Sequence, residues 1–301
     1  MRTKMIVTGL VVLGAMLSTS VASARVDVFV HGRNSGTSDV TDYWHVGAGA
    51  NNDGVLGFTG ANTEGNYTYA YDATASWSNL SADTMPVCAL TNAMYNAPGT
   101  DMALITHSAG GMSALYMLAV AQNGWANSCS TPPATAKAWA TYVVPTAGPF
   151  RGAQVADAVY GGTSGNWLQI ACGTVAGAIS NLLFNQATDM TWALQRSFMA
   201  NNFASLTAYG TYGSIYQNAG TGTGGDDGTV LGLAASCAGE EGTNDGFVSC
   251  NSGMGAPKGS TCGTNGLPGG HVGWYDGVSH SSNRRNDYNT FATHVWNQNP
   301  Y

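Results

Sequence analysis

The chain has 301 residues, of which 44% are hydrophobic and only 9% are charged, and its formal net charge is −7. This hydrophobic content is sufficient for a folded core and excludes an intrinsically disordered protein. The chain is acidic and lacks the clustered Lys and Arg residues with which proteins bind nucleic acid, so we expect no nucleic-acid partner.

The first 24 residues have the pattern of a secretory signal peptide. Arg2 and Lys4 precede an apolar run, Met5–Leu17, and Ala22-Ser-Ala24 has the small residues of a cleavage site. The apolar run is shorter than a membrane-spanning helix requires. We therefore expect a protein that is exported to the extracellular space and has no transmembrane anchor. Residues 25–301 are expected to form a single domain, and the protein is expected to be monomeric.

Predicted strands and helices alternate along the mature chain. Strands are predicted at 26–30, 67–71, 103–105 and 139–144, and helices at 83–95 and 112–122. Residues 167–203 have helical periodicity, 206–216 predict another strand, and 218–270 predict long loops around short strands. This alternation predicts an α/β fold with a mainly parallel sheet that is flanked by helices.

Six cysteines, all in the mature part, predict up to three disulfides. They are Cys88, Cys129, Cys172, Cys237, Cys250 and Cys262. Six cysteines allow fifteen pairings, but Cys250 and Cys262 are close in sequence and flank a Gly-, Ser- and Pro-containing segment, which favours a local bond. For the others we expect Cys88–Cys129 and Cys172–Cys237. The chain has no paired C-x-x-C spacing, which argues against a zinc site.

The segment 102–111, Met-Ala-Leu-Ile-Thr-His-Ser-Ala-Gly-Gly, contains the candidate nucleophile. It places Ser108 on a turn between a predicted strand and a predicted helix, which is the context of the G-x-S-x-G nucleophile elbow. Gly110 matches the last glycine of this pattern, whereas Thr106 stands where the pattern has its first. The alternative interpretation is a serine that caps the N-terminus of an ordinary helix.

A serine hydroxyl becomes a nucleophile only beside a base that is itself oriented by an acid. Asp245, in an Asn-Asp-Gly turn, is the candidate acid, and Asp227 is the alternative. His280, in a polar loop before a predicted C-terminal helix, is the candidate base; His271 and His294 are the alternatives. The order serine, aspartate, histidine is that of the α/β-hydrolases.

An oxyanion hole requires two backbone N–H groups that point at the developing negative charge. Ala109, directly after the candidate nucleophile, can supply one of them. The other is expected from the loop after the first strand, where Gly32 permits the backbone geometry and the N–H of Arg33 is the candidate.

Four short motifs occur in order along the chain. They are Val-Phe-Val-His-Gly at 28–32, Thr-His-Ser-Ala-Gly at 106–110, Pro-Phe-Arg-Gly with Val-Ala-Asp at 149–157, and Asn-Asp-Gly-Phe-Val-Ser at 244–249. Together they resemble the secreted bacterial triacylglycerol lipases of the α/β-hydrolase superfamily. The resemblance implies an α/β-hydrolase fold and ester hydrolysis, with Ser108 as nucleophile, Asp245 as acid and His280 as general base.

The same resemblance implies further features. Residues 163–205 match the place of a lid over the acyl pocket, although ordinary helices packed on the sheet would give the same pattern. A structural calcium is possible, with Asp227 in the place of one ligand and Ser282 near the place of another. The chemistry itself needs no cofactor. The expected partner is an ester, with lipids and polyesters as the candidate substrates. The alternatives are a secreted amidase or peptidase and an inactive hydrolase-fold binding protein.

Overall fold

The computed structural model describes residues 25–32, 63–68, 71, 75, 77–97, 101–153, 214–220, 242–257, 259–264, 266–267, 271–275, 277 and 279–280. The predicted signal peptide (1–24) and the predicted lid (163–205) lie outside these residues. Among the helices that are described, none combines the length and the hydrophobicity needed to cross a bilayer.

In the part of the chain that the structure describes, six strands form one sheet, in which every pairing between neighbours is parallel. The strands are β1 (Arg25–Val30), β2 (Thr63–Thr68), β3 (Met102–His107), β4 (Ala140–Thr146), β5 (Ser214–Gly220) and β6 (His271–Tyr275). Their order across the sheet is β2-β1-β3-β4-β5-β6. This arrangement confirms the parallel sheet that the alternation of strands and helices predicts.

The central strands are buried on both faces. Val28 of β1 and Leu104 of β3 belong to a core cluster that also contains apolar residues of the helices α2 (Pro86–Asn96) and α3 (Ala109–Asn123). Phe29 and Ile105, whose side chains alternate to the opposite face, are also buried. Continuous apolar runs of this kind are typical of parallel strands covered on both sides.

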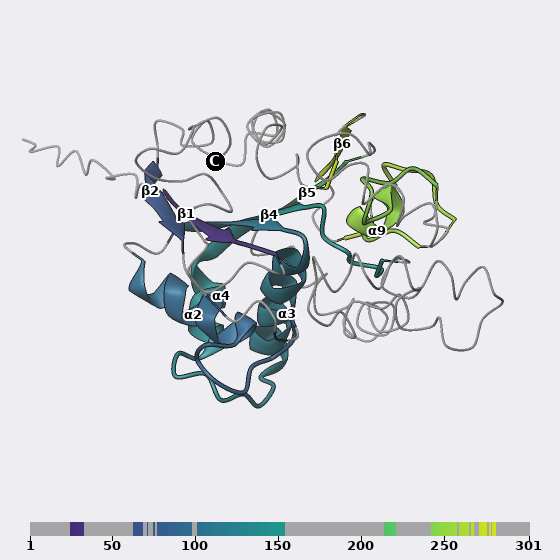
Figure 1. Ribbon diagram of the computed structural model, residues 1–301. Coiled ribbons are helices and arrows are strands. Elements are labelled where there is room, and N and C mark those ends of the chain that lie inside the picture. Colours follow the sequence, from purple (N-terminus) through teal and green to yellow (C-terminus); the bar gives the residue numbers. More distant parts are fainter. Residues whose placement is uncertain are drawn as a thin grey trace, which may run out of the picture.

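The helices α2, α3 and α4 (Pro133–Trp139) pack together on one side of the sheet, whereas the short helix α9 (Cys250–Gly253) lies near β5 and β6 (Figure 1). Pro86 is the first residue of α2, where its missing N–H costs no hydrogen bond. Gly124, in the left-handed conformation, ends α3.

Several element boundaries differ from the sequence predictions. The strand predicted at 67–71 is β2, which ends at Thr68, and the strand predicted at 206–216 overlaps β5 only at 214–216. Tyr71 lies outside β2, and its hydroxyl donates to the backbone carbonyl of His31, which follows β1. The strand predicted from Trp139 begins one residue later, since Trp139 ends α4, a helix that was not predicted. Short α9 was likewise expected to be loop.

Two of the three expected disulfides are present. Cys88–Cys129 joins α2 to the segment between α3 and α4, and Cys250–Cys262 joins α9 to the loop that follows it. The expected third bond, Cys172–Cys237, lies outside the described residues.

The two disulfides predict different losses of stability. They close chain segments with sequence separations of 41 and 12 residues. Loop-closure entropy then assigns about 4 kcal/mol to Cys88–Cys129 and about 3 kcal/mol to Cys250–Cys262. Urea denaturation of the two double Cys→Ala variants should show a larger drop in the free energy of unfolding for the Cys88/Cys129 pair. The reverse order would contradict this entropic assignment.

Candidate active site

The candidate nucleophile lies at a switch in the topology of the sheet. After β1 the chain continues to its neighbour on one side, β2, whereas after β3 it continues to its neighbour on the other side, β4. Open α/β sheets bind their ligands at such a switch point, beyond the carboxyl ends of the strands. His31 directly follows β1 and Ser108 directly follows β3, so both residues border this position.

Ser108 forms a strained turn between β3 and α3. Its backbone has φ 54° and ψ −133°, a conformation that side-chain-bearing residues rarely adopt and that costs roughly 1–3 kcal/mol. The Ser108 N–H donates to the carbonyl of Thr146 on β4 at 2.9 Å, and the Ser108 carbonyl accepts from the N–H of Gly111 at 3.0 Å. These bonds hold the turn that the elbow motif predicts.

The glycines after Ser108 allow the helix to approach the sheet. A Cβ at Gly110 would overlap the backbone carbonyls of Val30 and His31, so the N-terminus of α3 lies directly against the end of β1. A Cβ at Gly111 would lie 3.0 Å from the Thr106 hydroxyl. Thr106 therefore replaces the first glycine of the motif at a place where Gly111 leaves room for its side chain.

Three side chains form a continuous hydrogen-bonded line. His280 Nε2 lies 3.0 Å from Ser108 Oγ, and His280 Nδ1 lies 2.9 Å from Asp245 Oδ2. All three residues are buried, with exposed fractions of 3% for Ser108, 5% for His280 and 1% for Asp245. Because a carboxylate only accepts, Nδ1 donates to Asp245, which leaves Nε2 of the neutral ring to accept the serine proton.

A tight turn orients the Asp245 carboxylate. Its Oδ1 accepts the N–H groups of Phe247 at 3.0 Å and Val248 at 2.7 Å, while Oδ2 faces the His280 ring. Gly246 adopts φ 95°, which a glycine reaches without strain. The predicted Asn-Asp-Gly turn is thus present, but the apolar pair Phe247-Val248 leads into α9 rather than into a strand.

Of the alternative site residues, the structure describes only the backbone of His271. His271 is the first residue of β6 and pairs with Tyr216 of β5, whereas His280, five residues beyond β6, reaches Ser108. Asp227, His294 and the expected oxyanion donor Arg33 lie outside the described residues. Within the part of the chain that is described, no three His, Cys, Asp or Glu side chains are grouped closely enough to hold a metal ion.

Tyr71, which the sequence predicts to end a strand, contacts the first residue after β1. The Tyr71 hydroxyl donates to the His31 carbonyl, and the two rings stack with centroids 3.9 Å apart. His31 is fully buried, and its Nδ1 donates to the Gly32 carbonyl at 2.9 Å. Burial lowers the pKa of His31 from its ordinary value of 6.5 to about 4. No local pattern indicates this contact, because 40 residues separate its two partners.

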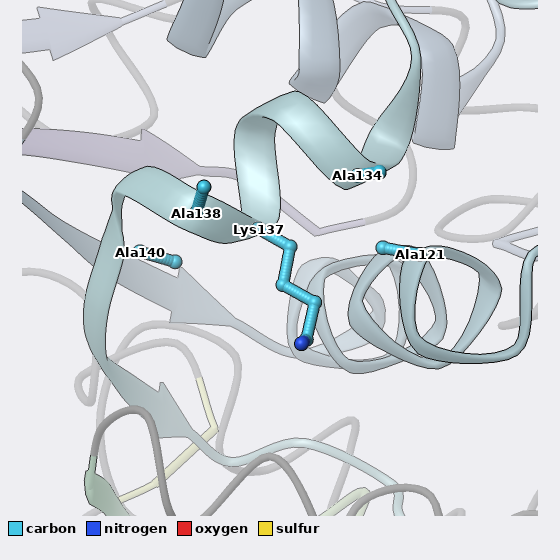
Figure 2. A pocket seen from close by; sticks show the side chains of 5 residues that line it. All are labelled: Ala121, Ala134, Lys137, Ala138 and Ala140. Carbon is cyan, nitrogen blue, oxygen red and sulfur yellow. The ribbon is translucent and has the colours of Figure 1, made fainter.

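A cavity of about 230 Å³ lies far from this site, between α3, α4 and the beginning of β4 (Figure 2). Its lining residues are Ala121, Ala134, Lys137, Ala138 and Ala140. Ala140 begins β4, whereas Thr146, which binds the Ser108 N–H, ends it, so the cavity is at the opposite edge of the sheet from the serine. It therefore cannot present a substrate to Ser108.

Comparison with solved structures identifies the fold. Mature lipase BlEst2 from Bacillus licheniformis aligns with a TM-score of 0.60 at 19% identity, covering 91% of each chain. Its propeptide form aligns with a TM-score of 0.56 at 17% identity, over 88% of this chain and 48% of the other. A metagenomic carboxyl esterase aligns with a TM-score of 0.52 at 12% identity, over 93% of this chain and 77% of the other.

By sequence alone, no protein-family model and no curated protein matches the chain. The structural neighbours are nevertheless bacterial lipases and esterases, and the chain has their α/β-hydrolase fold, as the four motifs imply.

The close approach at Gly110 predicts an asymmetric response to two neighbouring substitutions. Both Gly110→Ala and Gly111→Ala increase helix propensity, but only the first puts a methyl group against immobile backbone carbonyls. We expect Gly110→Ala to lower the free energy of unfolding by about 1–3 kcal/mol. A Cβ at Gly111 would lie 3.0 Å from the buried side chains of Thr106 and Phe150, so Gly111→Ala should cost less, because side chains yield more easily than backbone carbonyls. Equal effects in urea denaturation would contradict the close approach.

The buried His31 predicts a loss of stability in weak acid. Because its pKa is about 4 in the folded protein and 6.5 ordinarily, the unfolded chain binds the extra proton first as the pH falls. The neutral His31 ring therefore contributes fully to the free energy of unfolding above pH 6.5. This contribution falls by about 3 kcal/mol as the pH is lowered to 4. Between pH 7 and pH 4, wild type should lose this much more unfolding free energy than His31→Asn. If the unfolding free energies of wild type and His31→Asn changed equally with pH, His31 would not be the cause of the acid destabilisation.

Proposed function

We propose that this protein is a secreted serine hydrolase that cleaves carboxylic esters through an acyl-enzyme on Ser108. The observation that carries the proposal is the hydrogen-bonded line from Asp245 through His280 to Ser108, on a strained turn at the sheet's switch point. The α/β-hydrolase fold of the neighbouring lipases and esterases supports it.

The geometry matches the first step of acyl transfer. His280 Nε2, 3.0 Å from Ser108 Oγ, takes the hydroxyl proton while the oxygen attacks the ester carbonyl. The ring then carries a positive charge, which the Asp245 carboxylate stabilises from the Nδ1 side. His280 returns the proton to the leaving alcohol, and the acyl group remains on Ser108. Water, activated by the same histidine, then releases the acid.

The developing oxyanion needs two N–H donors. Ala109 supplies one at the N-terminus of α3, where backbone N–H groups have no partner within the helix. The loop after β1 is the proposed source of the other, through Arg33, and the missing Cβ of Gly110 supports this choice by bringing that loop against α3. The proposed chemistry requires no cofactor, because nucleophile, base and acid are all side chains of this chain.

Export belongs to the same proposal. The pattern of residues 1–24 supports a cleaved signal peptide, and the disulfides Cys88–Cys129 and Cys250–Cys262 suit an oxidising compartment. The acyl chain length distinguishes a lipase from a short-chain esterase or a polyester depolymerase, and it is the quantity that the activity assay measures.

Hydrolysis of nitrophenyl esters of increasing chain length tests the proposal. Wild type should hydrolyse at least part of the series and react covalently with a fluorophosphonate. Ser108→Ala should lose both properties, with kcat reduced on the order of 10⁴-fold or more, because the nucleophile itself is absent. Circular dichroism should show the fold unchanged.

Two other outcomes would overturn the proposal. Faster turnover of a matched anilide or peptide than of the ester would indicate an amidase or peptidase with the same nucleophile. A folded wild-type protein that neither hydrolyses esters nor reacts with the fluorophosphonate would indicate a binding protein on a hydrolase fold.

A further inference from the structure

His107, the last residue of β3, contacts the loop that carries the proposed base. It is buried, and its Nε2 lies 2.8 Å from the backbone carbonyl oxygen of His280. A carbonyl oxygen only accepts, so His107 Nε2 carries the hydrogen and donates it. The two imidazole rings also touch, with centroids 4.8 Å apart at an interplanar angle of 51°.

His280 must reach across the sheet to meet Ser108. It follows β6, which is separated from β3 by β4 and β5 in the strand order. Three strand spacings amount to about 14 Å, so strand register alone cannot place the ring beside the serine. The loop after β6 has to turn back toward β3, and Gly277, at φ 79°, lies within it.

The backbone of His280 is held at both of its polar groups. Its N–H donates to the Asp245 carbonyl at 2.8 Å, and its carbonyl accepts from His107. The His280 side chain is held by Asp245 at Nδ1 and by Ser108, the residue after His107, at Nε2. Main chain and ring are therefore tied to the acid turn on one side and to the end of β3 on the other.

We infer that His107 is a positioning residue for the general base: its Nε2–H anchors the His280 carbonyl, so that the His280 ring stays within hydrogen-bond distance of Ser108. His107 ends the central strand β3 and directly precedes Ser108. The anchor thus fixes the base relative to the nucleophile itself. This inference rests on the proposed function, since positioning matters only if His280 accepts the serine proton.

Substitutions at His107 separate positioning from packing. His107→Phe keeps a buried aromatic ring but has no donor, whereas the side-chain amide of His107→Gln can place an N–H near the position of Nε2. His107→Asn is polar like the glutamine but one methylene shorter, so its amide falls short of the His280 carbonyl. Thr91→Val on α2, which loses a buried hydrogen bond to Cys88 distant from the site, controls for stability.

Steady-state kinetics on the best nitrophenyl ester provides the readout. Displacement of a catalytic group by about 1 Å can cost on the order of 100-fold, so we expect kcat to fall about 10- to 100-fold in His107→Phe and His107→Asn. KM should remain within about 2-fold, because the buried His107 acts on the position of the base and not on substrate binding. His107→Gln should recover kcat to within about 3-fold of wild type, and Thr91→Val should match wild type.

Two results would overturn the inference while leaving the proposed function intact. One is an unchanged kcat in His107→Phe or His107→Asn; the other is a His107→Gln variant as impaired as His107→Asn, which would indicate packing alone. If His107→Phe does not fold, the kcat values of His107→Gln and His107→Asn alone distinguish positioning from packing. A wild-type protein that neither hydrolyses esters nor reacts with the fluorophosphonate would instead refute the proposed function, and the inference with it.

Discussion

The positive φ angle at Ser108 is the constraint around which the site is arranged. A side-chain-bearing residue holds this conformation only where its surroundings enforce it. Here the Thr146 carbonyl binds the Ser108 N–H, and the missing Cβ of Gly110 lets α3 begin against the end of β1. The strain is thus supported by three adjacent strands, β1, β3 and β4, whose apolar side chains form the core. The result is a serine presented at the edge of the sheet with a helix N-terminus behind it.

The remaining site residues arrive on loops that need their own restraints. The proposed acid is held by its turn, in which Asp245 accepts the N–H groups of Phe247 and Val248. The proposed base, His280, is held by contacts from Asp245 on one side and His107 on the other. The loop after β1 is restrained by Tyr71. The first two restraints tie the loops of Asp245 and His280 to a compact turn and to the end of β3, as a preorganised site requires.

Much of the fold and of the candidate site could be predicted because the relevant patterns are local. The apolar segment before Ser108, the helix after it and the Asn-Asp-Gly turn around Asp245 each span fewer than 20 residues. The boundaries of β2 and β5 could not be predicted in the same way. A strand's ends depend on which residues its neighbours offer for pairing, and those neighbours lie far away in the chain.

The sequence by itself determined the parallel α/β architecture, the serine on its turn, and the order of acid and histidine candidates, because periodicity and turn chemistry act over short distances. Only the tertiary structure decided that His280 meets Ser108, a contact across 172 residues. It also showed how Gly111 makes room for Thr106, and why His107 faces the His280 loop. These relations depend on the distances between separate strands and loops, which packing sets and local patterns do not encode.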